Sequence, residues 1–153
     1  MTQRLTVQRT IAADPATIFE ILATPSGHVA IDASGMLMSA EGDRVTNVGD
    51  RFDVQMDRES LNDYPLGRYD VTVVITKYVQ DELIEWTIEG AIQPPLRHLY
   101  GYRLEPHELG CLVTSYYDWS EIDEAWRGKG VFPVLPEAAL RATLGILART
   151  VRT

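Results

Sequence analysis

The stretch PEAALRATLGILARTVR, residues 136–152, decides the fold class of this sequence. Its large apolar side chains recur at steps of four, three and four residues: Leu140, Leu144, Leu147 and Val151. This spacing is typical of an α-helix and places the four side chains on one stripe of its surface. Pro136 suits the first helical position, where no amide hydrogen bond is lost. We therefore predict one long amphipathic helix at the end of the chain.

Most of the chain before this helix has the pattern of short β-strands. Residues 69–79 give the clearest strand, because they are rich in Val, Ile, Thr and Tyr. In residues 83–89 the apolar Ile84, Trp86 and Ile88 alternate with polar side chains, which indicates a half-buried antiparallel strand. Further strands are predicted at residues 5–11, 36–40, 52–56, 97–105 and 111–119.

One or two short helices are predicted between the first and second strands. Asp14-Pro15 is a helix start, and Pro25 ends that helix. Residues 26–35 are less regular, and the sequence allows a second brief helix there. Short connections favour antiparallel pairing, and an amphipathic helix after a run of strands must bury its stripe on their sheet. The predicted class is α+β, with about seven strands in a curved antiparallel sheet around the C-terminal helix.

Length and charge limit the protein classes to consider. The chain has 153 residues, which suits a single domain spanning 1–153, and a formal net charge of −8. An acidic chain is a poor partner for nucleic acid. No apolar run approaches the roughly 20 residues that cross a bilayer, and no apolar signal segment follows Met1. We expect a cytoplasmic protein that does not insert into membranes.

Four stretches carry a resemblance to a known family. They are His28-Val29-Ala30-Ile31-Asp32 followed by Ser34-Gly35, Gly49-Asp50-Arg51-Phe52, residues 98–106 (HLYGYRLEP), and Tyr117-Asp118-Trp119-Ser120. With the order of elements, they make the chain resemble the START-like or SRPBCC superfamily, in its polyketide cyclase/dehydrase-type branch. The resemblance covers almost the whole chain and implies the helix-grip fold.

The resemblance also implies an apolar cavity between the concave sheet and the last helix. Members of the superfamily bind lipids, sterols, polyketides or plant hormones there, and a minority catalyse cyclisation or dehydration. Fold alone does not carry an activity over to this chain. Lipid binding and polyketide chemistry are therefore expectations, and no cofactor is implied.

Aromatic side chains gather on the strand faces that alternation turns inward, where they would either line a pocket or fill a solid core. His98 and Ser115 share those faces, and a dry core seldom contains several such polar groups. We predict a cavity whose mouth lies near residues 64–67 and 128–130. The predicted ligand-binding residues are Met56, Trp86, His98, Tyr100, Tyr102, Ser115, Tyr117, Trp119, Leu140 and Leu144.

Other candidate sites have simpler structural interpretations. His28 and Asp32 are four residues apart, but no Gly-x-Ser-x-Gly elbow accompanies them, so we interpret them as an exposed pair that fixes a turn. The three histidines lack metal-ligand spacing, and no metal site is predicted. Cys111 is the only cysteine and excludes an intrachain disulfide.

Three functions are compatible with the sequence. The first is binding of a hydrophobic small molecule, lipid or polyketide-like, in the cavity. The second is a polyketide aromatase/cyclase or dehydratase that uses the same cavity, although Arg103 and Asp118 fall on the opposite strand parity and no catalytic signature is present. The third is a ligand-free interaction module, such as a toxin–antitoxin or stress-related partner. A homodimer is left open.

Overall fold

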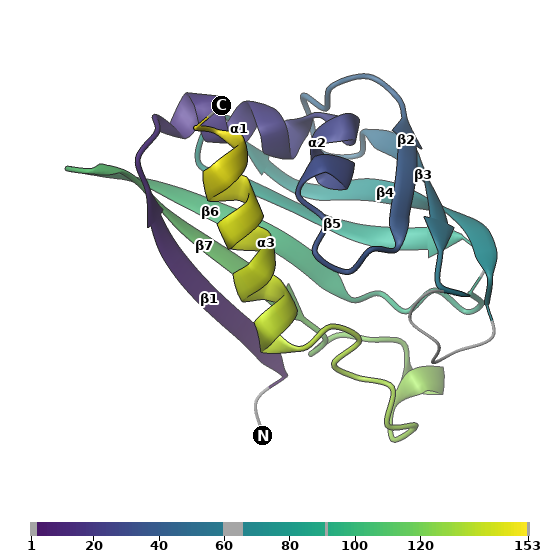
Figure 1. The fold of residues 1–153 in the computed structure, drawn as a ribbon. Coiled ribbons are helices and arrows are strands. Elements are labelled where there is room, and N and C mark those ends of the chain that lie inside the picture. Colours follow the sequence, from purple (N-terminus) through teal and green to yellow (C-terminus); the bar gives the residue numbers. More distant parts are fainter. Residues whose placement is uncertain (1–2, 60–65, 91, 153) are drawn as a thin grey trace.

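A computed structural model of the protein describes residues 3–59, 66–90 and 92–152. The elements in chain order are β1 (Arg4–Ile11), α1 (Pro15–Ala23), α2 (Pro25–Ala30), β2 (Leu37–Glu41), β3 (Arg51–Asp57), β4 (Arg68–Val79), β5 (Leu83–Gly90), β6 (Leu99–His107), β7 (Gly110–Asp118), η2 (Glu124–Trp126) and α3 (Glu137–Thr150). The strands form an antiparallel sheet in the order β1-β7-β6-β5-β4-β3-β2 (Figure 1). The predicted fold class is confirmed.

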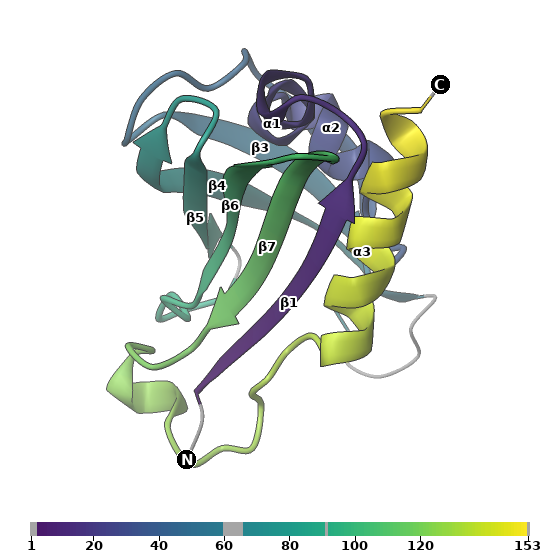
Figure 2. The same cartoon turned by 90° about the vertical axis from the view of Figure 1, so that its left-hand side faces the viewer.

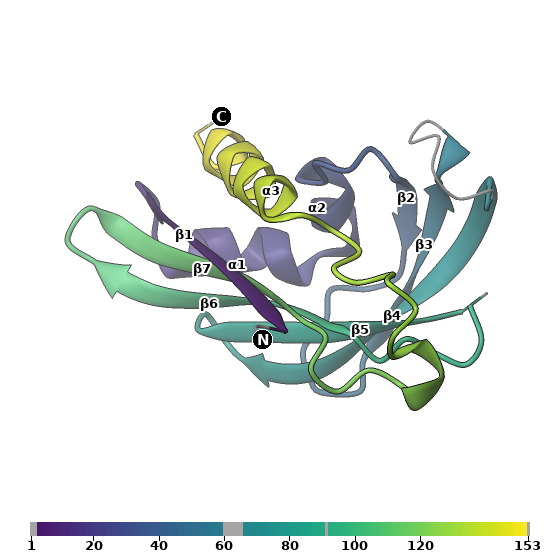
Figure 3. The same cartoon turned by 90° about the horizontal axis from the view of Figure 1, so that it is seen from below.

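The helices lie on one face of this curved sheet. Figure 3 shows α1, α2 and α3 on the same side of the strands. α3 crosses the sheet obliquely and lies beside the edge strand β1 (Figure 2). This arrangement makes the concave face an interior and leaves the convex face outside.

The apolar stripe of α3 packs as its spacing predicts. Leu140, Leu144 and Leu147 are buried, and Val151 is half-buried. The helix begins at Glu137, so Pro136 is its N-cap and not its first helical residue, because Pro136 has extended backbone angles. The exposed face has an ion pair from Arg141 to Glu137, of 3.4 Å.

The two short helices follow the prediction with one correction. Asp14 caps α1 through its backbone carbonyl, which accepts from the amides of Thr17 and Ile18, and its side chain makes no cap hydrogen bond. Pro25 does not only end α1. It also begins α2, which covers Pro25–Ala30 and is shorter than the predicted 26–35. A proline suits this place because the first turn of a helix has amides without helical partners.

The convex face contains a buried acidic residue that alternation placed in water. Glu85 has only 4% of its surface exposed, although it faces away from the cavity side of β5. Its carboxylate accepts hydrogen bonds of 2.8 Å from the hydroxyls of Tyr116 and Thr76. The Tyr116 ring lies over Gly101, where an added Cβ would be 2.2 Å from the ring. Because Gly101 has no side chain, Tyr116 can lie across β6 and cover Glu85.

Candidate functional site

A cavity of about 130 Å³ lies between the concave face of the sheet, α2 and the first turns of α3. Six of the predicted ligand-binding residues line it: Met56, Trp86, Tyr100, Tyr102, Ser115 and Leu140. The remaining four do not: His98, Tyr117, Trp119 and Leu144. Parity on the strands and the stripe on α3 therefore placed most of these side chains at the cavity wall. Whether any of them binds a ligand stays a prediction.

The flat wall of the cavity is built from three aromatic rings on neighbouring strands. Trp86 on β5 is the cross-strand partner of Tyr100 on β6. The Trp86 ring stacks on Tyr100 at a centroid distance of 6.0 Å and on Tyr102 at 5.8 Å. Stacked aromatic rings expose a broad planar surface, which suits a flat apolar guest.

His28 forms part of the same wall, which corrects its interpretation as an exposed residue. Only 9% of its surface is exposed, and its ring packs edge-on against Trp86 at 4.7 Å and Phe52 at 5.0 Å. Its Nε2 lies 2.7 Å from the carbonyl oxygen of Leu22. A carbonyl only accepts, so Nε2 carries the proton. Burial lowers the pKa of His28 to about 4, so the ring is neutral near pH 7 and Nδ1 is an acceptor.

The two tyrosine hydroxyls at the cavity are neutral donors. Burial raises the pKa of both Tyr100 and Tyr102 above the ordinary value. Ser115 is the cross-strand partner of Tyr102 and hydrogen-bonds its phenolic oxygen. Tyr100 is in turn hydrogen-bonded to Tyr117. These contacts orient both phenols without charging them.

His98 and Tyr117 lie behind Tyr100 and not in the cavity wall. His98 Nδ1 and the Tyr117 hydroxyl share a hydrogen bond of 2.7 Å. The Tyr117 ring stacks on Tyr100 at 4.6 Å and also packs against Trp119 at 5.4 Å. Burial lowers the pKa of His98 to about 4. The strand β6 begins at Leu99, whereas the sequence predicted a strand from residue 97. His98 therefore precedes the strand, and the alternation of β6 does not place its side chain in the cavity wall.

Arg58 is a buried residue near the cavity that the sequence patterns did not identify. It has 7% of its surface exposed, and its Nη1 lies 3.0 Å from the sulfur of Met36, which lines the cavity. Its charge lowers the pKa of Tyr100, against the stronger effect of burial. Arg58 follows Asp57, the last residue of β3. Beyond the end of a strand the alternation of inward and outward side chains no longer holds, so the sequence did not predict that Arg58 is buried. Arg103 and Asp118, by contrast, lie outside the cavity wall, as their parity predicts.

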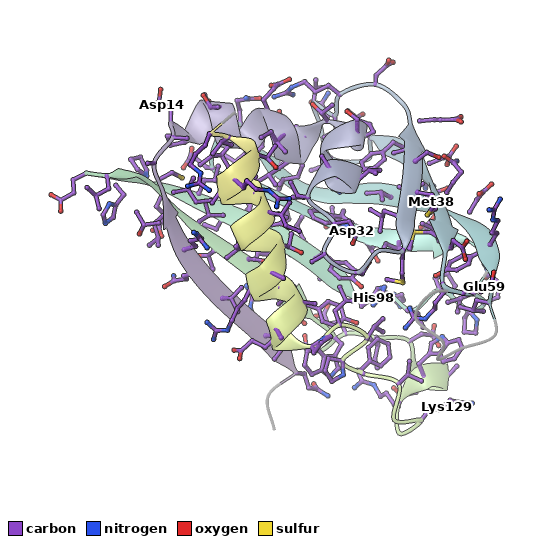
Figure 4. The ribbon with its side chains drawn as sticks, viewed as in Figure 1. Asp14, Asp32, Met38, Glu59, His98 and Lys129 are labelled. Carbon is purple, nitrogen blue, oxygen red and sulfur yellow. The ribbon has the colours of Figure 1, made fainter. Side chains whose placement is uncertain are left out.

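The rim of the cavity is held by Asp32, between α2 and β2. Its carboxylate accepts hydrogen bonds from the Ser34 amide at 2.9 Å, the Ser34 hydroxyl at 2.6 Å and the Leu37 amide at 3.2 Å. Asp32 therefore fixes a turn, as predicted, but without His28. Figure 4 shows Asp32 between α2 and the strands and His98 lower on the sheet.

The half-buried residues of the lining show where the cavity approaches the protein surface. They come from the α2–β2 segment, from the start of α3 and from strands β5 and β6: Asp32, Ser34, Leu37, Leu135, Thr143, Ile88 and Tyr100. Residues 66, 67 and 128–130 do not line the cavity, and Lys129 lies at the tip of a separate loop (Figure 4). The predicted residues 64 and 65 fall outside the described part of the chain.

Several apolar residues of the lining were also missed at the level of sequence. Val54, Val71, Val73 and Ile88 share the inward parity of Met56 or Trp86, so alternation alone would have identified them. Leu22, Ile31 and Met36 come from the helical segment, whose packing against the sheet no local pattern showed. Within residues 3–59, 66–90 and 92–152, no group of three His, Cys, Asp or Glu side chains could hold a metal ion.

Comparison with protein families matches residues 2–152 to the family described as polyketide cyclase/dehydrase and lipid transport. No curated protein matches the sequence. No helix in the described residues is long and apolar enough to cross a membrane.

Several solved structures share the fold at low sequence identity. Protein CV1439 from Chromobacterium violaceum is 14% identical, covers 100% of this chain and 99% of its own, and has a TM-score of 0.69. The AHSA1-like protein from Aeromonas hydrophila is 16% identical over 97% of this chain and 92% of its own, with a TM-score of 0.65. The Aha1 dimer from Colwellia psychrerythraea is 16% identical over 99% and 96%, with a TM-score of 0.61. These similarities show the fold alone.

Proposed function

Since this chain belongs to the polyketide cyclase/dehydrase and lipid transport family, we propose that it binds a compact hydrophobic molecule in the cavity beneath α3. The cavity itself is the observation that supports the proposal. A ligand-free interaction module would be expected to have a filled core, whereas this core encloses about 130 Å³. Burial of apolar ligand surface would supply affinity at roughly 25 cal/mol per Å², before the cost of association.

The size of the cavity limits the ligand. Apolar cavities of about 150 Å³ hold a single benzene ring, and pockets for drug-sized molecules begin near roughly 300 Å³. At about 130 Å³ the present cavity suits one ring. A lipid chain or a multi-ring polyketide would require α3 or the α2–β2 connection to move outward. We therefore place a compact guest before the lipid or polyketide that the family name suggests.

Titration with toluene tests this proposal. Trp86 lines the cavity, whereas Trp126 lies in η2 with its Nε1 donating to the Pro94 carbonyl at 2.8 Å. We expect toluene to shift the indole NMR signal of Trp86 saturably and to leave that of Trp126 unchanged. Equal shifts of both indoles would indicate surface adsorption, and no shift of Trp86 would refute binding in the cavity.

The cyclase or dehydratase remains the second candidate, and one observation favours it. The Tyr100 phenol faces the cavity and is connected through Tyr117 to His98. A neutral phenol can donate to a carbonyl oxygen on which negative charge develops. Turnover of a poly-β-ketone that is abolished by Tyr100→Phe, with binding retained, would support catalysis.

A homodimer and a cytoplasmic location also stay proposals. The Colwellia relative is described as a dimer, and β2 is an edge strand of the sheet here. Light scattering of the purified chain over a range of concentrations would measure the oligomeric state.

A further inference from the structure

His28 is a residue of the cavity wall that can accept a hydrogen bond. Its Nε2 donates to the Leu22 carbonyl, so its second nitrogen, Nδ1, has a lone pair to offer. Among the described residues no other hydrogen-bond partner of His28 is observed. An acceptor at the wall of an apolar cavity is costly to leave without a donor. A guest that supplies a donor removes this cost.

The Tyr102 hydroxyl is a second polar group in the same cavity wall. Tyr102 and His28 both pack against the Trp86 ring, at centroid distances of 5.8 Å and 4.7 Å. Burial keeps the Tyr102 phenol protonated, so its hydroxyl can donate to a guest that carries an acceptor. The wall therefore presents an acceptor, His28 Nδ1, and a donor, the Tyr102 hydroxyl, around the Trp86 ring.

A hydroxyl group is the smallest neutral substituent on a ring that can both donate to His28 and accept from Tyr102. It donates through its proton and accepts through its oxygen. The volume of about 130 Å³ leaves room for one ring beside it. We infer that the ligand is an uncharged, hydroxylated single-ring compound of the phenol class, whose hydroxyl donates to His28 Nδ1. This inference rests on the proposed function, because it names the ligand class of the same cavity.

Charged relatives of such a compound fit the cavity less well. His28 in the wall and His98 behind Tyr100 are neutral at pH 7, and Tyr100 and Tyr102 remain protonated. An ammonium group would find the Asp32 carboxylate at the rim, but that carboxylate already accepts three hydrogen bonds from Ser34 and Leu37. A neutral hydroxyl costs less to desolvate than an ammonium group.

Phenol and toluene make a matched pair of probes, because they share one ring and the same number of non-hydrogen atoms. In a purely apolar cavity phenol would bind more weakly, since its hydroxyl would lose its hydrogen bonds to water. We expect phenol to bind the full-length protein at least as tightly as toluene. Benzylamine is the third probe, and tighter binding of benzylamine than of phenol would overturn the inference in favour of Asp32.

Two substitutions distinguish the roles of the two ring nitrogens of His28, because each keeps the hydrogen bond of only one of them. The amide of His28→Gln reaches the position of Nε2 and keeps a donor for the Leu22 carbonyl. His28→Asn places its oxygen near Nδ1 and keeps the acceptor instead. Loss of a buried partner weakens binding by about tenfold, so phenol affinity should fall by about that factor in His28→Gln and be retained in His28→Asn. Toluene affinity should stay within about twofold in both variants. A purely structural role would damage His28→Asn more than His28→Gln.

A measurement on the unmodified protein covers the case in which a variant fails to fold. Nitrogen NMR of the His28 ring should show Nε2 protonated, and phenol should shift the Nδ1 signal while toluene leaves it in place. If toluene binds but phenol does not perturb Nδ1, the hydroxyl assignment is wrong and the proposed function stands. If neither probe binds, both fail.

Discussion

The Tyr116 hydroxyl donates a 2.8 Å hydrogen bond to Oε1 of Glu85, across the glycine that separates their strands. The two residues lie on the convex face, opposite the cavity. Arg4 covers the Tyr116 ring at 4.1 Å, and Lys77 approaches the Glu85 carboxylate at 3.9 Å. A buried carboxylate is tolerated here because its oxygens are hydrogen-bonded.

Replacing Glu85 by Ala should lower the free energy of unfolding by about 1–3 kcal/mol, since the buried Tyr116 hydroxyl and the half-buried Thr76 hydroxyl lose their acceptor. Glu89→Ala is the matched control, because Glu89 lies on the same strand and face but its side chain is 42% exposed and pairs with Arg51 at 3.0 Å. Exposed ion pairs contribute about 0–1 kcal/mol. Urea denaturation measures both variants, and equal losses would show that Glu85 is not special.

Gly101→Ala should destabilise the protein through Tyr116 alone. The new Cβ would lie 2.2 Å from the Tyr116 ring, so the ring must move and its bond to Glu85 is lost. In a Tyr116→Ala background the same Gly101→Ala change should cost much less, because the obstructing ring is gone. A double-mutant cycle measures the difference, and strictly additive effects would contradict the contact.

Filling the cavity should abolish binding without unfolding the protein. Val71 lines the cavity, whereas Val113 is fully buried and does not. Val71→Phe should occupy the space of the guest and leave the melting temperature nearly unchanged. Val113→Phe should instead lose about 1–3 kcal/mol of stability through overpacking. Toluene binding that survives in a folded Val71→Phe variant would place the guest elsewhere.

Enlarging the cavity should broaden the range of guests. Leu140 lines the cavity at α3, while Leu147 on the same helix stripe is fully buried against the core. Leu140→Ala should raise the affinity for naphthalene relative to toluene, since it extends an existing space. Leu147→Ala should mainly cost stability, by about 2–5 kcal/mol. Calorimetric titration with the two guests checks the ratio of affinities.

Acidification should weaken folding through His28 and His98. Burial lowers the pKa of each from 6.5 to about 4, so the unfolded chain binds more protons between these values. The stability that each neutral histidine contributes is therefore complete above pH 6.5 and is lost as the pH falls towards 4. The slope should reach up to about 1.4 kcal/mol per pH unit for each histidine. Denaturation curves from about pH 8 down to about pH 4 measure it, and His98→Asn should reduce the slope.

Periodicity predicted the elements of this fold because each amphipathic segment shows its own buried face. The stripe of α3 and the alternation of Trp86 on β5 needed only local spacing. The same local logic placed most of the predicted binding residues at the cavity. It failed for His28, because α2 is a six-residue helix whose burial depends on contact with distant strands.

Two further residues show where local patterns end. Glu85 has outward parity, and only the missing side chain of Gly101 on the next strand lets Tyr116 cover it. Arg58 follows the end of β3, so no alternation fixes its direction. In both cases the burial of the residue depends on a segment that is close in space but distant in sequence. A short window of sequence around the residue therefore does not reveal it.

The polar contact between Tyr116 and Glu85 also bears on how such a protein can diversify. It ties β5 to β7 from outside, so the alignment of these strands does not depend on the side chains inside. Interior positions such as Val71 and Leu140 are then free to vary in volume while the frame around them keeps its shape. A scaffold held together from its back can acquire new ligand preferences by small steps, each of which leaves a folded intermediate for selection.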